Sequence, residues 1–434
     1  MLFNRINNRA LIHKGIFIPV LISIFLLISG CGTLSPSSNK ANDKKNMETE
    51  LTIYSSFQDQ FFYKYYGNYL IQEYPNIKFR LIQSTSENAE EMAKEVQQSK
   101  PDLIITWKDN FRELQRQNML TDLNNFVQSR DFNLEDYYPE MITTLQNDTG
   151  QLNGLSPMVS PFVVFYNKNL FDENKIGYPT NQISWDEMLS LTQQFIGSGT
   201  TGLTGRSPAS LLSAIAKSKG WKIVDTHSKN LIFNAQEWTS SIQKILDSSR
   251  GGNLVNDTGE LFLQGKAAMH YGTLDMIPKL LEKNSFAWEV VTTPVDSLNR
   301  DISSDIYFYD IFCIPEEASQ KEAAWEVIQA LLSGESVTYL QNNSIPGSVS
   351  TLSKYMNSQY GNVDLSAIWK QKIDNKPYLS SELSRNFIDK FDGVVDTVLT
   401  RAVSNKNISP EECFTEIEEQ AKVLYQEERQ AKSE

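Results

Sequence analysis

Trp107, Lys108 and Asp109 stand side by side where the apolar run Leu103–Ile105 ends at Thr106. The run has the composition of a buried parallel strand. An aromatic face and a carboxylate at the end of such a strand can bind a molecule by stacking and by charge-assisted hydrogen bonds. The alternative is that the indole closes the hydrophobic core. On these residues alone, both interpretations stay open.

Patterns that carry catalysis are absent from the sequence. There is no Gly-x-x-x-x-Gly-Lys-Ser/Thr phosphate loop, no Gly-x-Ser-x-Gly turn and no His-Glu-x-x-His zinc motif. After the N-terminal segment the only histidines are His227 and His270, and His270 lies in a predicted strand. The stretch Gly197–Gly202 follows a predicted helix and is interpreted as a loop. A pair of acids for glycoside hydrolysis stays open. We predict no catalytic residue, no metal site and no cofactor.

Length and charge narrow the class of protein. The chain has 434 residues, which is enough for two or three lobes, and a formal net charge of −13. An acidic surface repels phosphate backbones and so argues against nucleic acid as a partner. Cys313 lies in an apolar run and Cys413 in a predicted helix, and both are interpreted as unpaired thiols.

The N-terminus has the pattern of a bacterial export signal. Three basic residues precede the apolar run "IFIPVLISIFLLIS", which is short and interrupted by proline. Ser29, Gly30 and Cys31 then resemble a lipobox. This resemblance implies a lipoprotein signal peptide over 1–30 and lipidation of Cys31, with palmitate-type acylation anchoring the protein to the outside of the cell membrane. Residues 31–49 are polar and predict a flexible tether. An ordinary secretory signal is the alternative.

Strands and helices alternate after the tether. The runs "LTIYSS", "IKFRLIQ" and "DLIIT" predict strands, and "FQDQFFYKYYGNYLIQEY" and "ENAEEMAKEVQQS" predict the helices between them. This order indicates a parallel α/β sheet, whose ligands bind beyond the carboxyl ends of the strands. Ser55 and Ser56 follow the first strand and Trp107 follows the third, so all three are candidate ligand residues.

A second α/β unit follows the first. Predicted strands cover 162–167, 266–272 and 309–315, and predicted helices cover 184–196, 207–220, 234–249, 320–334 and 409–428. Ser184 is a candidate N-cap, because Glu187 stands at the third helical position and can complete a capping box. In the first unit, Phe62, Tyr66 and Tyr69 recur at helical spacing, which indicates a core-facing side rather than a metal-phenolate site.

Six blocks in sequence order resemble the extracellular solute-binding proteins of bacterial ABC importers, in the family that includes maltose-binding protein. The blocks are "LIQEYPNIKFRLI", "PDLIITWKDNFRELQRQNMLTDLNNFV", "VVFYNKNLFDENKIGYPTNQISWDEML", "LFLQGKAAMHYG", "KEAAWEVIQALLSGESVTYLQNNSIP" and "NISPEECFTEIEEQAKVL". Together they run through nearly the whole chain after the tether. Each block is weak by itself, and the specificity comes from their order.

The resemblance implies a type II periplasmic-binding-protein-like fold. It has two α/β lobes, each a sheet flanked by helices, with a hinge between them and a ligand cleft that closes by hinge motion. The implied boundaries are 50–160 for the first part of lobe 1, 161–304 for the first part of lobe 2, 305–345 for the return to lobe 1, and 346–434 for the C-terminal helices of lobe 2.

The resemblance also implies which residues contact the ligand. In maltose binders a Trp and an acid at the corresponding strand end contact sugar, which implies that role for Trp107 and Asp109. The family contact point after "AAMHYG" implies the same for Tyr271, Gly272 and Thr273. Tyr307, Tyr309 and Asp310 precede the return strand and are expected to face the cleft. The sequence departs from maltose binders at Leu274, where a Trp is usual, and it lacks a clear counterpart of their stacking Tyr, so a maltodextrin ligand is not implied.

We therefore expect a monomeric, lipid-anchored binding protein that captures a small solute, with an oligosaccharide favoured, and delivers it to the permease subunits of an ABC importer. A polyamine ligand is an alternative, because Trp107, Asp109 and Asp310 would suit a polycation. Arg206 is the one hint of a phosphate-type ligand. A sensor that presents its ligand to a membrane receptor kinase is a further alternative, and a secreted hydrolase is the least favoured.

Overall fold

The computed structural model describes residues 48–86, 88–129, 132–225, 227–343, 349–353, 359–360, 363–374, 379–380 and 383–431. The predicted signal peptide, the predicted lipidation site Cys31 and the predicted tether up to residue 47 lie outside these ranges. The first strand already begins at Thr49, which was assigned to the tether. In the described ranges, no helix has both the length and the apolar content needed to cross a bilayer.

The first sheet has four strands in the order β11-β3-β1-β2. Its strands are β1 (Thr49–Ser55), β2 (Ile77–Gln83), β3 (Leu103–Thr106) and β11 (Ile311–Cys313). β1 pairs in parallel with both β2 and β3, as the alternation of strands and helices predicts. β11 comes from a distant part of the chain and pairs antiparallel with β3.

Helices pack around the first sheet and share its hydrophobic core. They are α2 (Asp59–Phe62), the π-helix η1 (Tyr63–Gly67), α3 (Asn68–Glu73), α4 (Ala89–Ser99), α5 (Lys108–Arg116), α6 (Asn124–Ser129), the 3-10 helix η2 (Leu134–Asp136), α7 (Pro139–Leu145), α14 (Lys321–Leu331) and α15 (Gly334–Asn343). Phe62, Tyr66 and Tyr69 are buried in this core, which confirms their interpretation as packing residues.

The second sheet has seven strands, in the order β10-β4-β7-β5-β6 with β12 and β8 also paired to β4. The strands are β4 (Met158–Asn167), β5 (Thr201–Thr204), β6 (Leu254–Val255), β7 (Ala267–Thr273), β8 (Trp288–Thr292), β10 (Ile306–Phe308) and β12 (Val349–Ser350). Smaller pairs are formed by β15 (Lys372–Ile373) with β9 (Ile302–Ser303), and by β13 (Gln359–Tyr360) with β14 (Val363–Asp364).

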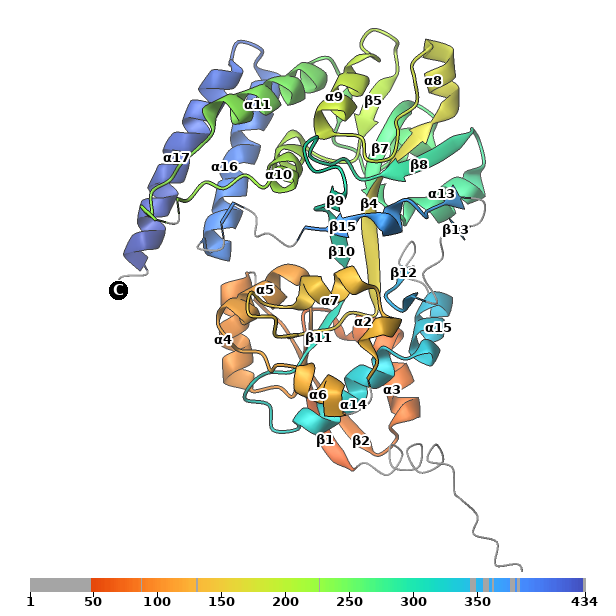
Figure 1. Ribbon diagram of the computed structural model, residues 1–434, viewed down its shortest axis with the longest axis vertical. Coiled ribbons are helices and arrows are strands. Elements are labelled where there is room, and N and C mark those ends of the chain that lie inside the picture. Colours follow the sequence, from red (N-terminus) through yellow and green to blue (C-terminus); the bar gives the residue numbers. More distant parts are fainter. Residues whose placement is uncertain are drawn as a thin grey trace, which may run out of the picture. The chain divides into compact units, whose positions relative to one another are not determined.

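Both faces of the second sheet are covered. Along β4, Val164 and Tyr166 belong to one hydrophobic cluster, and Val163 and Phe165 to another on the opposite face. The helices are α8 (Lys168–Asn174), α9 (Trp185–Gln193), α10 (Pro208–Ser218), α11 (Ala235–Arg250), α12 (Glu260–Leu263), α13 (Met276–Lys283), the 3-10 helix η4 (Ile368–Lys370), α16 (Arg385–Ser404) and α17 (Pro410–Ala431). The last two pack side by side against α10 and α11 (Figure 1).

The chain passes between the two sheets through paired segments. Leu155 and Phe312 exchange two backbone hydrogen bonds of 3.0 and 2.7 Å. Val159, near the start of β4, lies opposite Phe308 of β10 and Val349 of β12. Leu155–Ser160 and Ile306–Phe312 therefore run antiparallel beside one another, and we call them the crossing strands. The lobe boundaries at residues 160, 304 and 345 remain predictions.

The interpretation of Gly197–Gly202 was wrong. The stretch Gly197–Gly202 was assigned to a loop, but its last two residues begin β5, which lies between β7 and β6. Gly202 packs so closely on α9 that an added Cβ would stand 2.5 Å from the carbonyl oxygen of Thr192. The glycines therefore indicate close packing of a short strand under a helix as well as a turn.

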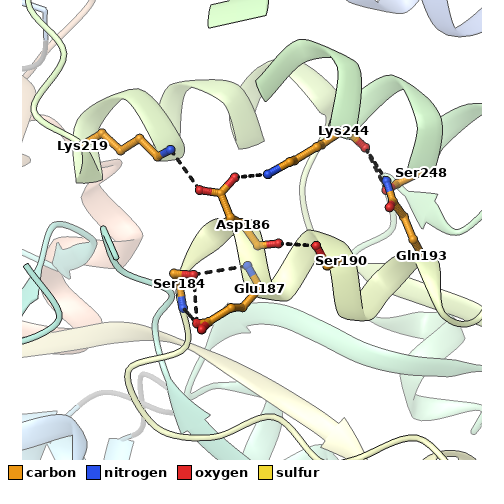
Figure 2. A network of polar contacts seen from close by, with 8 residues as sticks. All are labelled: Ser184, Asp186, Glu187, Ser190, Gln193, Lys219, Lys244 and Ser248. Atoms are coloured by element: carbon orange, nitrogen blue, oxygen red, sulfur yellow. Dashed lines mark hydrogen bonds and ion pairs between the residues drawn. The ribbon is translucent and has the colours of Figure 1, made fainter. Parts of the chain in front are cut away.

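The N-terminus of α9 is fixed by the polar network in Figure 2. The Ser184 side chain accepts a hydrogen bond from the Glu187 N–H at 3.2 Å, and the Ser184 N–H donates to the Glu187 carboxylate at 2.8 Å. This confirms the predicted capping box. Asp186 forms ion pairs with Lys219, at 3.1 Å, and with Lys244. Burial opposes ionisation of Asp186, but the two lysines lower its pKa overall.

Replacing Gly202 with alanine tests the close contact between β5 and α9. We expect Gly202→Ala to lower the free energy of unfolding by about 1–3 kcal/mol, because the new methyl group must displace the Thr192 backbone. Urea unfolding followed by circular dichroism measures this. Gly177→Ala is the control, since nothing lies within 4 Å of a Cβ at that position. Equal stability of the two variants would contradict the packing argument.

The capping box predicts a pH dependence of stability. The Arg300 guanidinium and the Ser184 N–H lower the pKa of Glu187 from its ordinary 4.5 to about 2. Because the folded-state pKa is the lower one, the stabilisation is complete above pH 4.5 and is lost as the pH falls toward 2. Half of the side chain is exposed, so we expect Glu187→Gln to cost about 1 kcal/mol or less at pH 7.

The measurement is the urea midpoint of wild type and Glu187→Gln at pH 7, 4 and 3. The difference between the two should shrink as the pH falls. Glu282→Gln is the control, because Glu282 is exposed and makes no ion pair or hydrogen bond within the described residues. A difference that stays constant across the three pH values would rule out the proposed linkage.

Candidate functional site

Polar side chains at the carboxyl end of the first sheet form one hydrogen-bonded group. The hydroxyls of Ser56 and Thr106 are 2.8 Å apart, and the Asn110 amide donates to the Ser56 hydroxyl at 3.3 Å. They meet because β1 and β3 are parallel neighbours that end at the same edge. Ser55 is fully buried and its hydroxyl bonds to the backbone of Phe57 instead. Ser56, and not Ser55, is therefore the serine that reaches this edge.

Trp107 lies at the same edge, as the residue directly before α5. Its side chain is partly exposed, and its ring meets the Phe57 ring edge-to-face with centroids 4.8 Å apart. Phe57 stacks on Phe61 at 5.1 Å, and Phe61 contacts Tyr65 at 4.3 Å. The indole is thus the end of a row of aromatic rings. It is packed on one side and open to solvent on another.

The first two residues of α5 connect the edge of the first sheet to distant segments. Asp109 has a 61% exposed side chain and pairs with Arg385 of α16 at 3.1 Å. The Lys108 amine lies 5.5 Å from the centre of the Phe308 ring in β10. Burial, together with the charges of Lys217 and Arg112, lowers the pKa of Lys108 to about 7.

A second group of polar side chains surrounds Asp305, just before β10. Its carboxylate accepts hydrogen bonds from Arg206 and from the Tyr271 hydroxyl, each at 2.7 Å, and Lys217 lies 3.8 Å away. Burial alone would raise the pKa of Asp305, but the charges of Arg206 and Lys217 lower it overall. Asp305 is therefore an ionised carboxylate with a 14% exposed side chain. We call Lys108, Arg206, Lys217, Tyr271 and Asp305 the Asp305 cluster.

Arg206 is positioned by the turn after β5. Gly205 has φ +122°, and an added Cβ there would overlap the carbonyl oxygen of Tyr271, so the backbone lies directly on β7. The guanidinium group consequently stacks 4.3 Å from the centre of the Phe162 ring and 5.1 Å from that of Tyr271. Two rings and one carboxylate therefore hold its plane.

The predicted residues on β7 have different surroundings. Tyr271 is buried, its hydroxyl also lies 3.0 Å from that of Thr293, and its ring packs on Trp185 at 5.3 Å. Gly272 is buried against the ring of His270. The Thr273 hydroxyl donates to Asp275. Tyr271 thus belongs to the Asp305 cluster, whereas Gly272 and Thr273 make none of its contacts.

The predicted residues at the crossing strands are not equally accessible. Tyr307 is 42% exposed, and its ring meets the partly buried Tyr309 ring at 5.1 Å. Asp310 is 1% exposed and accepts a hydrogen bond from the Tyr66 hydroxyl. Burial raises the pKa of Asp310 to about 7. Within the described residues, its second carboxylate oxygen is buried without a hydrogen-bond partner.

Several residues of this region were not predicted as ligand residues from the sequence. They are Lys108, Asn110, Phe162, Lys217 and Asp305. In the sequence analysis, Asp305 is only the first residue of the segment that returns to lobe 1. Arg206 is only the residue that suggests a phosphate-type ligand. Their partners lie far apart in the chain, as with Arg206 and Asp305, which are 99 positions apart. Local spacing therefore gives no signal of this cluster.

Other candidate sites have weaker geometry. The surface hollows on either side of Asp186 are lined by α9 and its neighbours, where the acid is already paired with Lys219 and Lys244. In the described part of the chain, His, Cys, Asp and Glu form no group of three that could hold a metal ion. Cys313 and Cys413 are buried and unbridged.

Comparisons with known proteins agree with this architecture. The family model of bacterial extracellular solute-binding proteins matches residues 69–351. A comparison with curated protein sequences finds no match. Among solved structures, a sugar transporter from Rhizobium etli in an open conformation has 17% identity and a TM-score of 0.65, covering 86% of this chain and 99% of its own.

Two further structures are similar over comparable lengths. An ABC substrate-binding protein from Listeria monocytogenes in complex with cycloalternan has 17% identity and a TM-score of 0.63, covering 86% of this chain and 98% of its own. A maltose-bound protein from T. maritima has 15% identity and a TM-score of 0.60, covering 87% and 100%. With the family match over most of the described residues, they confirm the predicted family and fold. The chain belongs to the bacterial extracellular solute-binding proteins and has the two-lobed α/β fold of these similar structures.

Proposed function

We propose that this protein captures a carbohydrate between its two lobes, at the crossing strands, and delivers it to the permease of an ABC importer. One observation carries the proposal: groups from both sheets meet there. The amine of Lys108, the neighbour of Trp107 in the first lobe, lies 5.5 Å from the centre of the Phe308 ring. Phe308 stands three residues after Asp305, which bonds to Arg206 beside the second sheet. Ligands of such folds bind where the two lobes face one another.

The chemistry of these groups suits a carbohydrate. The partly exposed rings of Trp107 and Phe162 offer faces on which the C–H groups of a pyranose can stack. Ser56, Thr106 and Asn110 offer hydroxyl and amide groups that both donate and accept hydrogen bonds, as sugar hydroxyls require. Structures of similar fold are named as a sugar transporter, a cycloalternan complex and a maltose complex, which supports the same ligand class.

The carboxylates favour a carbohydrate over a polyamine. A polycation needs accessible, uncompensated acids. Asp109 is paired with Arg385, and Asp305 with Arg206. Asp310 is 1% exposed, and its pKa is raised to about 7 by burial, so part of this carboxyl group is protonated at neutral pH. The acids that supported a polyamine in the sequence therefore offer little free charge.

The proposal includes the predicted lipid anchor at Cys31 and the closure of the two lobes around the ligand. Lipidation of Cys31 would hold the protein at the outer face of the cell membrane, within reach of the permease. Bending at the crossing strands would close the lobes around the ligand, and a permease that binds the closed form better would receive loaded protein preferentially. The lobe boundaries 50–160, 161–304, 305–345 and 346–434 and the monomeric state belong to this proposal.

The test is thermal unfolding of the full chain, purified in detergent, against oligosaccharides, polyamines, phosphorylated compounds and ferric chelates. A ligand at a hundred times its dissociation constant should stabilise the fold by about 2.7 kcal/mol. We expect an oligosaccharide to raise the midpoint of the wild type and to raise that of Trp107→Ala much less, because the variant lacks the stacking surface.

Trp288→Ala is the matched control. Trp288 is also partly buried, but it pairs with Asn167 at the end of β4 that is farthest from the crossing strands. It should lose intrinsic stability while keeping the full shift on ligand addition. If an oligosaccharide shifts Trp107→Ala as much as wild type, the indole is a packing residue. If only a polyamine raises the midpoint, the carbohydrate proposal is wrong.

A further inference from the structure

The Asp305 cluster contains more positive than negative charge. Arg206 and Lys217 both lie within ion-pair distance of Asp305. The charge of Lys108 also acts on Asp305 and helps to lower its pKa. Across the described residues, no other carboxylate is within ion-pair distance of Arg206 or Lys217, and none is within that distance of Lys108. Arg206, Lys217 and the partly charged Lys108 amine therefore share one carboxylate, which neutralises only one positive charge.

Arg206, Lys217 and Lys108 have N–H donors that form no hydrogen bond within the described structure. Arg206 uses one nitrogen on Asp305, and its other nitrogens make no hydrogen bond within the described structure. Lys217 is 30% exposed, and its amine lies too far from Asp305 for a hydrogen bond. The nearest partner of the Lys108 amine is the face of the Phe308 ring. A structural role requires one cation for Asp305 and leaves the remaining donors unexplained.

The arrangement is also organised in advance of binding. The Arg206 guanidinium lies over the rings of Phe162 and Tyr271 and bonds to Asp305, while the side chain is 22% exposed, so its unbonded nitrogens are held in place and remain accessible. A planar fork of donors matches the two oxygens of a carboxylate. Burial and the charges of Lys217 and Arg112 oppose the charged form of Lys108, whereas Asp109 and Asp305 favour it. An anion placed beside this amine would relieve the repulsion among the cations.

We propose that the carbohydrate bound by this protein is acidic, and that Lys108, Arg206 and Lys217 bind its anionic group. A hexuronate carboxylate fits best, because the planar fork of N–H donors on Arg206 matches the two oxygens of a carboxylate. The inference rests on the proposed function and names the substrate class of the same site. The chain as a whole has a formal charge of −13, so the excess of cations around Asp305 is opposite in sign to the net charge of the protein.

The test is isothermal titration calorimetry of the full chain in detergent with a uronic-acid oligosaccharide, its neutral counterpart, a sulfated oligosaccharide and inorganic phosphate. We expect the uronate to bind at least about tenfold more tightly than the neutral sugar. Lys217→Met and Lys108→Met should each weaken uronate binding about tenfold or more and weaken neutral-sugar binding by a much smaller factor. Lys283→Met, at an exposed position without an ion pair in the described structure, should change neither.

The outcomes separate the two proposals. If Lys108→Met fails to fold, Lys217→Met still tests the inference, because the Lys217 side chain is 30% exposed and makes no hydrogen bond to Asp305. Binding of the sulfated sugar with the same lysine dependence would support an anionic carbohydrate and point away from a carboxylate-specific site. Equal affinity for acidic and neutral sugars, or uronate binding unaffected by both variants, would overturn this inference and leave the proposed function standing. Binding of phosphate without any sugar would overturn both.

Discussion

The structure depends on how the chain crosses between its two sheets. A backbone that leaves one sheet and enters another must keep its N–H and C=O groups paired on the way. Here the crossing segments satisfy each other: Leu155 bonds to Phe312, and Val159 lies between Phe308 and Val349. In the proposed function, bending at these paired segments closes the two lobes around the ligand. Tyr309 and Asp310 lie where the return segment passes from β10 to β11.

Charge at this crossing is constrained by the same geometry. Asp305 stands at the entrance to β10, where burial would make a lone carboxylate costly. Arg206 and Tyr271 donate hydrogen bonds to it from the second sheet, and the Trp185 ring meets the Tyr271 ring edge-to-face. The Trp-Asp-Glu block that marks the family thus has two roles. Asp186 and Glu187 fix the start of α9, and Trp185 supports a residue of the Asp305 cluster.

The two edges that meet at the crossing differ in character. The edge of the first sheet carries neutral donors and acceptors beside a row of aromatic rings that ends at Trp107. The second sheet carries a stacked guanidinium and an excess of positive charge. A ligand that contacts both would place ring faces and hydroxyls against Trp107 and Ser56, and its anion against Lys108, Arg206 and Lys217. This difference between neutral and positively charged groups is the physical basis for proposing that one acidic sugar contacts both edges.

The sequence by itself determined the elements and the family. Apolar runs of the right period predicted β1, β2, β3, β4 and β7 and the main helices, because burial of regularly spaced side chains is a local property of the chain. The Ser184–Glu187 capping box was equally local and is present. The order of the six motif blocks identified the family, and parallel strand order brought Ser56 and Trp107 to one edge.

Only the tertiary structure decided which charged groups meet. The start of β5 was hidden in a glycine-rich stretch, since its strand character comes from packing under α9. Arg206, Lys217 and Asp305 lie in separate elements and come together because β5, β7 and the crossing strands converge. Asp109 and Asp310 looked alike in the sequence, yet one is paired in solvent and the other is buried. Burial and long-range pairing depend on all of the chain at once, so no local pattern of residues encodes them.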